Sequence, residues 1–167
     1  ADHGGQMRIT ERQAARAILL TPEDEVLLMR VEVQNGSFWI CPGGGLQAGE
    51  TPPQALRREL AEELGLAHAP IGPLLWRRRH EMTLYGRRWH QSEDYFAVAT
   101  DRFVPRMQDA AEARILREFR WWHPAELRHS TDVIVPAPLL RVILDFRSHG
   151  PPQAPLAVEL VRDDPGA

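Results

Sequence analysis

A run of three glycines, Gly43–Gly45, constrains this chain more than any other feature of its sequence. Consecutive glycines lose the most backbone entropy on ordering, so they are placed where a chain turns sharply or must approach another group closely. Thr51, which two prolines follow, is typical of an N-cap, and Gln54 stands where a capping box places its reciprocal partner. The sequence therefore predicts a loop at the glycines and a helix that begins directly after Thr51.

The predicted helix has an apolar stripe and a defined end. Leucines recur every four residues, at Leu56, Leu60 and Leu64, which places them along one face. Gly65 then suits the left-handed backbone position that commonly ends a helix. We expect about four helical turns, packed through the leucines against a hydrophobic core.

Three carboxylates, those of Glu59, Glu62 and Glu63, border the leucine stripe. At about 100° per residue they fall within roughly a third of the helix circumference. Like charges this close repel one another, so positive charge is expected among them. Arg58 can reach Glu62 across one turn, but one arginine leaves excess negative charge, and such oxygen ligands suit Mg²⁺ or Mn²⁺. The alternative is a solvated acidic face, because charged residues are mostly exposed.

The spacing of these residues decides between the two interpretations. The specified positions of the Nudix hydrolase signature are all met, by Gly44, Glu50, Arg58-Glu59-Leu60, Glu62-Glu63 and Gly65-Leu66. Since each strict position is met by chance about once in fifteen, a complete coincidence is very improbable. The chain thus resembles a Nudix hydrolase, and we call residues 44–66 the glycine-helix motif.

The resemblance implies a fold and a metal site. The fold would be of the α/β class, an α/β/α sandwich with a mixed central β-sheet, called the Nudix fold. The oxygen ligands of Mg²⁺ or Mn²⁺ would be the carboxylates of Glu59, Glu62 and Glu63 and the carbonyl of Gly43. Arg58 would hold the carboxylates by charge-assisted hydrogen bonds. Glu50 is expected to brace the loop against the helix, with a direct or water-mediated metal contact as the alternative.

The general base is left open by the resemblance, because the family takes it either from the motif or from a later loop. Glu63 is the candidate within the motif. Glu112 is the candidate in the later loop, and Glu118 is held in reserve. For each loop acid alone, a solvated carboxylate explains the residue as well as catalysis does.

Residues outside the metal ligands would select the substrate. Gly44 is expected at the substrate, and Arg78, Arg87 and Arg88 could meet phosphates, although exposed strand arginines need no such role. Stacking on a base is conceivable for four aromatic residues, but burial in the core is the favoured interpretation of each: Trp39, Trp76, Tyr85 and Trp89. Tyr85 also lies roughly where dinucleoside-polyphosphate hydrolases of this family have a tyrosine.

Length and patterning predict one domain. The 167 residues, 43% hydrophobic and 26% charged, fit a loose segment over residues 1–9, a domain over 10–149 and a proline-rich, irregular tail over 150–167. Two hairpins are expected, from strands 13–20 with 25–31 and strands 74–84 with 88–100. The remaining predicted elements are strands over 38–41 and 119–122, a helical turn over 124–127 and a second helix over 138–146.

Charge and cysteine content limit the partners. The net charge of −3 argues against dedicated nucleic-acid binding and leaves small anionic ligands possible. The resemblance implies a small nucleotide diphosphate derivative as the partner, and a homodimer is left open. Cys41 is the only cysteine, so an intramolecular disulfide cannot form and a cytoplasmic location is expected. No apolar run reaches ~18 residues, so no membrane segment is expected.

Together with the resemblance, these features predict a divalent-metal-dependent hydrolase. It would cleave the phosphoanhydride bond of a nucleoside diphosphate linked to a group X, by attack of water on phosphorus. Substrates to test are ordinary and oxidised nucleoside triphosphates, ADP-ribose, nucleotide sugars and dinucleoside polyphosphates. The alternative is a non-catalytic nucleotide-binding or regulatory module of the same fold, which would be expected to have lost motif carboxylates. A third hypothesis, ranked below these two, is an isomerase or transferase that uses the same scaffold.

Overall fold

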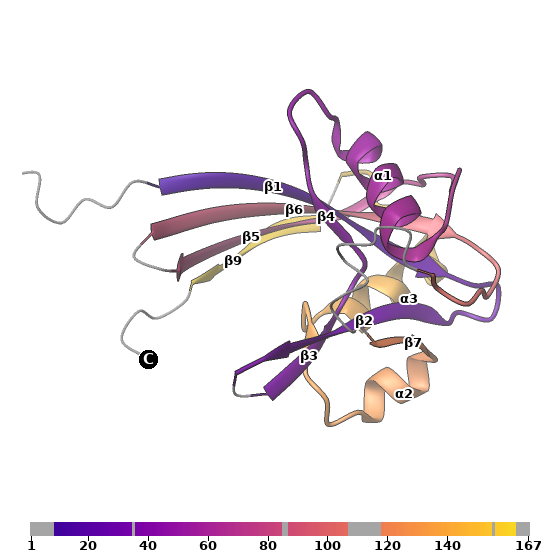
Figure 1. The fold of residues 1–167 in the computed structure, drawn as a ribbon. Coiled ribbons are helices and arrows are strands. Elements are labelled where there is room, and N and C mark those ends of the chain that lie inside the picture. The colour runs from indigo at the N-terminus through magenta and orange to yellow at the C-terminus, as the bar shows by residue number, and fades with distance from the viewer. Residues whose placement is uncertain (1–8, 35, 85–86, 107–117, 155, 163–167) are drawn as a thin grey trace, which may run out of the picture.

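The computed structural model describes residues 9–34, 36–84, 87–106, 118–154 and 156–162. Within these ranges it has three helices and a nine-stranded sheet (Figure 1). In chain order the elements are β1 (Ile9–Leu20), β2 (Val26–Val33), β3 (Gly36–Ile40), β4 (Gly43–Gly45), α1 (Pro52–Leu64), β5 (Leu74–Leu84), β6 (Arg87–Ala99), β7 (Glu118–Trp122), α2 (Pro124–His129), β8 (Ile134–Val135), α3 (Leu139–His149) and β9 (Leu156–Arg162).

Strand β1 organises the sheet, whose order is β8-β3-β2-β1-β6-β5-β9. It runs parallel to β6 from Ile9 to Leu20. Its antiparallel pairing with β2 is registered at Leu20, and residues 14–16, which come earlier in the same strand, pair antiparallel with β4. In Figure 1, β1, β6, β5 and β9 accordingly reach out as one wing, while β2, β3 and β7 form another. Because β2 leaves the edge of β1, the glycine strand β4 can occupy that edge.

Helices cover both faces of the sheet, as the predicted α/β/α sandwich requires. Successive side chains of a strand point to opposite faces, so β1 contributes to two separate hydrophobic clusters. Ala17 and Leu19 pack with the three leucines of α1, each of which is buried. Ile18 and Leu20 pack on the other face, with the α3 residues Leu139, Val142 and Ile143. Each fully buried leucine contributes about 1.5–3 kcal/mol to this packing.

The signals at the two ends of α1 are confirmed. Thr51 Oγ1 accepts a hydrogen bond from the backbone N–H of Gln54 at 3.3 Å, and the side-chain Oε1 of Gln54 accepts one from the backbone N–H of Thr51 at 2.9 Å. Gly65 has the left-handed φ of 70° that was expected after the last turn. No helix within the described ranges is both long enough and apolar enough to cross a membrane.

Both predicted hairpins are also confirmed, since β1 with β2 and β5 with β6 pair antiparallel. The expectation of an irregular segment from residue 150 onward is wrong, because β9 (Leu156–Arg162) pairs in parallel with β5. Prolines at 151, 152, 155 and 165 flank this strand without interrupting it. The strand also covers an edge of β5 that would otherwise present unpaired backbone groups.

Candidate functional site

The glycine strand β4 lies in a space too narrow for side chains. Gly43 pairs with Arg16 of β1, has a φ of 146°, and a Cβ there would lie 2.1 Å from the carbonyl oxygen of Ala15. A Cβ on Gly44 would lie 2.5 Å from the carboxylate carbon of Glu59. The glycines therefore allow β1 and the acidic edge of α1 to approach the same backbone closely.

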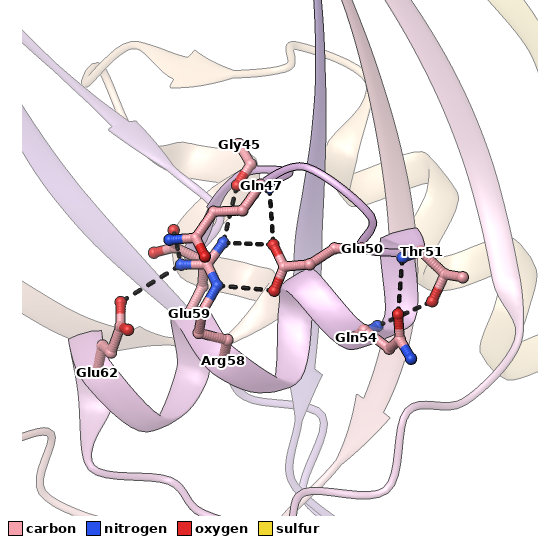
Figure 2. A network of polar contacts seen from close by, with 8 residues as sticks. All are labelled: Gly45, Gln47, Glu50, Thr51, Gln54, Arg58, Glu59 and Glu62. Carbon is pink, nitrogen blue, oxygen red and sulfur yellow. Dashed lines mark hydrogen bonds and ion pairs between the residues drawn. The ribbon is translucent and has the colours of Figure 1, made fainter.

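Arg58 is the centre of the polar network at this site (Figure 2). Its Nε and Nη2 donate to the two carboxylate oxygens of Glu50 at 2.8 and 2.9 Å, and Nη2 also donates to the Gly45 carbonyl at 3.0 Å. Its Nη1 donates to Glu59 Oε1 at 3.0 Å and to Glu62 Oε2 at 3.4 Å. One guanidinium thus ties the loop to two of the motif carboxylates, which is the geometry expected of Arg58.

Glu50 joins the loop to the helix. Besides the forked pair with Arg58, it accepts a hydrogen bond from the Gln47 amide at 2.7 Å. The hydrogen bonds from Arg58 and then from Gln47 lower the pKa of the Glu50 carboxyl, and the bond to Glu50 is the main cause of a raised pKa for Arg58. Both groups are therefore charged near neutral pH. This geometry agrees with the bracing role expected of Glu50 and leaves its metal contact a prediction.

Glu63 lies beneath the glycine strand. Only 2% of the residue is exposed, and its Oε1 accepts a hydrogen bond from the Gly43 amide at 3.2 Å. A carboxylate can be buried at tolerable cost only when such donors compensate for the lost water. Glu59 and Glu63 are thus both placed against the loop, Glu59 at Gly44 and Glu63 at Gly43.

The donor chemistry fits a hard divalent cation, because three carboxylates and a carbonyl lie within one loop-helix unit. Across the described ranges, however, no three His, Cys, Asp or Glu side chains surround a single point that could hold a metal ion. Glu59 and Glu62 face Arg58 instead, and Glu63 faces the Gly43 amide. The printed hydrogen bonds use one carboxylate oxygen each of Glu59, Glu62 and Glu63, and the assignment of these residues as metal ligands remains a prediction.

Arg16 and Glu93 were missed by the sequence reasoning. Arg16 Nη1 donates to the carbonyls of Cys41 and Gly43 at 3.3 and 3.4 Å, and its Nε donates to Glu93 Oε2 at 3.0 Å. The Gly43 carbonyl, expected as a metal ligand, therefore has an arginine partner in this structure. A signal existed, since Arg16 interrupts the apolar run of residues 14–20.

The arginines expected at substrate phosphates occupy different environments. Arg78 is only 8% exposed and pairs with Glu93 at 2.9 Å, so its interpretation as an exposed strand arginine is wrong. Arg88 is exposed and donates to Glu81 at 3.3 Å. Arg87 is also exposed and lies over the Trp89 ring, 5.7 Å from its centroid.

The other candidate residues divide between the core, the surface and the part of the chain that is not described. Trp39 and Trp76 are buried in the core, as favoured, while Glu118 is exposed and pairs with Arg30 at 3.0 Å. Tyr85 and Glu112 lie outside the described residues. Their predicted roles, and that of Glu118 as a reserve base, stay predictions.

Comparison with known proteins identifies relatives. A family model described as NUDIX domain matches residues 10–142. An RNA pyrophosphohydrolase from Erythrobacter litoralis is 30% identical over 131 residues, which cover 70% of this chain and 78% of the relative. An 8-oxo-dGTP diphosphatase from Proteus vulgaris is 61% identical over 31 residues, 19% of this chain and 28% of the relative. The chain spans less than half the length of that protein and of three other curated relatives.

Solved structures share the fold. A MutT protein from Methanosarcina mazei Go1 superimposes with a TM-score of 0.62 at 17% identity, covering 86% of this chain and 97% of that protein. The E. coli ORF135 protein superimposes with a TM-score of 0.59 at 24% identity, covering 84% and 93%. These structures support the α/β/α architecture, and the family model spans most of the sequence. The chain therefore belongs to the NUDIX domain family.

Proposed function

We propose that this chain is a Nudix pyrophosphohydrolase, which cleaves the phosphoanhydride bond of a nucleoside diphosphate linked to a group X. Water attacks one phosphorus, and two phosphate-containing products leave. The observation that carries the proposal is the Arg58 network, in which one guanidinium connects the glycine strand with Glu50, Glu59 and Glu62. Every carboxylate of the motif is present, which speaks for catalysis.

Mg²⁺ or Mn²⁺ would be held by Glu59, Glu62, Glu63 and the Gly43 carbonyl. When bound, the ion neutralises phosphoryl charge and makes its water more acidic. The protein supplies the positioning: Arg58 restrains the carboxylates, and Gly44 leaves room for the loop backbone to approach the diphosphate. Glu63 is the proposed base, with Glu112 and Glu118 as the candidates outside the motif.

The substrate class follows from the names of the relatives and from the chemistry of the site. The relatives named above are an RNA pyrophosphohydrolase and an 8-oxo-dGTP diphosphatase, and both names denote cleavage of a pyrophosphate linkage. We propose the same linkage here. The test set contains ordinary and oxidised nucleoside triphosphates, ADP-ribose, nucleotide sugars, dinucleoside polyphosphates and a short RNA with a 5′-triphosphate.

A nucleotide-binding or regulatory module of the same fold is the second candidate. One observation favours it, namely that the described carboxylates do not converge on one point. The two candidates differ in turnover, since a binding module would retain affinity for a nucleotide without releasing phosphate products.

The test is a phosphate-release screen over that substrate set, with Mg²⁺ and with Mn²⁺, on the wild type and on Glu63→Gln. Glutamine keeps an oxygen that can accept from the Gly43 amide but cannot take up a proton, so the fold should persist. Loss of a general base lowers turnover by about 10²–10⁴-fold. Glu25→Gln is the matched control, because Glu25 pairs with Arg102 at 3.0 Å outside the motif.

The outcomes of this screen separate the candidates. Wild-type turnover together with its collapse in Glu63→Gln supports hydrolysis that depends on the Glu63 carboxylate, as base or as metal ligand. Full turnover in Glu63→Gln transfers the role of base to another acid. Binding of nucleotides without any turnover by the wild type establishes the module.

A further inference from the structure

Three charged side chains, two of them buried and that of Arg16 largely buried, form a row on the sheet face opposite α1. They come from neighbouring strands: Arg16 from β1, Glu93 from β6 and Arg78 from β5. The Arg16–Glu93 pair is 3.0 Å long and the Arg78–Glu93 pair 2.9 Å, and the exposed fractions of the three side chains are 15%, 5% and 10%. Ile18 and Leu20 follow Arg16 at intervals of two and pack with α3, so Arg16 lies on that same face.

The row reaches the candidate site through the backbone of Gly43. From the α1 side, Glu63 Oε1 accepts a hydrogen bond from the Gly43 amide at 3.2 Å. From the opposite side, Arg16 Nη1 donates to the Gly43 carbonyl at 3.4 Å and to the Cys41 carbonyl at 3.3 Å. One glycine is therefore held between a motif carboxylate and a largely buried arginine.

The row is a costly arrangement. Burial opposes the charge of Arg16, but attraction to Glu93 outweighs this effect and raises the pKa of Arg16, with a smaller contribution from Glu63. Burial likewise opposes the charge of Glu93, and the two arginines nevertheless keep its pKa low. The buried Nε of Arg78 has no hydrogen-bond partner among the described groups. Buried ion pairs are often no more stabilising than apolar residues of the same size, so stability alone does not account for the row.

We propose that Arg16, anchored by Glu93 and Arg78, is a positioning residue of the divalent-metal site. It fixes the Cys41 and Gly43 carbonyls, so that the glycine strand presents the Gly43 backbone both to Glu63 and to the cation. This inference rests on the proposed metal-dependent function. It extends the site from the glycine-helix motif across the sheet to β5 and β6.

The experiment measures Mn²⁺ affinity of the full chain without nucleotide, by the electron paramagnetic resonance signal of free Mn²⁺. Substitution of a residue that hydrogen-bonds to a metal ligand typically lowers metal affinity by about 10–100-fold. We expect Arg16→Met to weaken Mn²⁺ binding at least tenfold. Arg16→Lys keeps the charge but cannot reach Glu93 and two carbonyls with a forked group, so a smaller loss is expected.

Arg147→Met is the matched control. Arg147 also combines a carboxylate with a backbone carbonyl, at 2.6 Å from Asp24 and 2.7 Å from the Thr21 carbonyl, but it does not contact the glycine strand. Its substitution should lower the melting temperature and leave Mn²⁺ affinity unchanged. A purely structural role of Arg16 would produce that same pattern in Arg16→Met and would overturn the inference.

The remaining outcomes are equally decisive. If Arg16→Met does not fold, Arg16→Lys carries the test, and wild-type affinity in Arg16→Lys overturns the inference. A wild type that binds no Mn²⁺ overturns it as well. A wild type that binds Mn²⁺, with the expected losses in the variants, supports the inference even if no substrate is turned over; only the proposed hydrolysis would then fail.

Discussion

A single guanidinium does most of the positioning within the motif. Arg58 makes five hydrogen bonds, to both oxygens of Glu50, to the Gly45 carbonyl, to Glu59 and to Glu62. Its forked, planar geometry matches a carboxylate in a way that a lysine ammonium cannot reproduce. We therefore expect this position to require the forked guanidinium of arginine rather than a positive charge alone.

Substitution of Arg58 tests this requirement. We expect Arg58→Lys and Arg58→Met each to lower kcat by about 10–100-fold, because both lose the forked pair with Glu50 and the support of Glu59. Steady-state kinetics on the substrate found in the screen measures the effect. The exposed Arg57 is the neighbouring control, and Arg57→Met should retain wild-type kcat. Near-normal kcat in Arg58→Lys would mean that charge suffices.

At the scale of the element, α1 has a cap that can be altered without touching a motif carboxylate. Thr51→Ala removes the acceptor for the backbone N–H of Gln54. Loss of such a cap typically lowers the free energy of unfolding by about 1 kcal/mol. For a chain of this size we expect the melting temperature to fall by about 2–4 °C, measured by circular dichroism. Thr131→Ala, at an exposed loop position, is the control. An unchanged melting temperature in Thr51→Ala would show that the cap does not stabilise the helix.

The same element explains why α1 was predictable. Its start, its stripe and its end are each encoded within a few residues, at Thr51, the leucines and Gly65. The row of Arg16, Glu93 and Arg78 was not, because Arg16 and Glu93 are 77 positions apart and meet only through the parallel pairing of β1 with β6. Strand β9 was not predicted, because the prolines before and after its seven residues favour an irregular segment, although the run itself contains no proline.

At the scale of the whole molecule, the stability of the fold depends on two adjacent carboxylates of β6, whose pKa values are shifted in opposite directions. Attraction to Arg16 and Arg78 overcomes the effect of burial and lowers the pKa of Glu93. Burial raises the pKa of Asp94, despite its pairing with Arg77. A lowered pKa means that ionised Glu93 favours the folded state, whereas a raised pKa means that ionisation of Asp94 disfavours it.

Glu93→Gln and Asp94→Asn should therefore differ in how their stability depends on pH. Glu93 contributes fully above its unfolded pKa of about 4.3, and the contribution is lost as pH falls through its lower folded value. The stability advantage of the wild type over Glu93→Gln should thus be large at neutral pH and shrink below about pH 4. The free energy of unfolding of the wild type relative to that of Asp94→Asn should be highest in acid and should fall as pH rises. Urea unfolding across this range measures both differences, and a pH-independent gap for Glu93→Gln would show that Glu93 is not held by its ionised pairs.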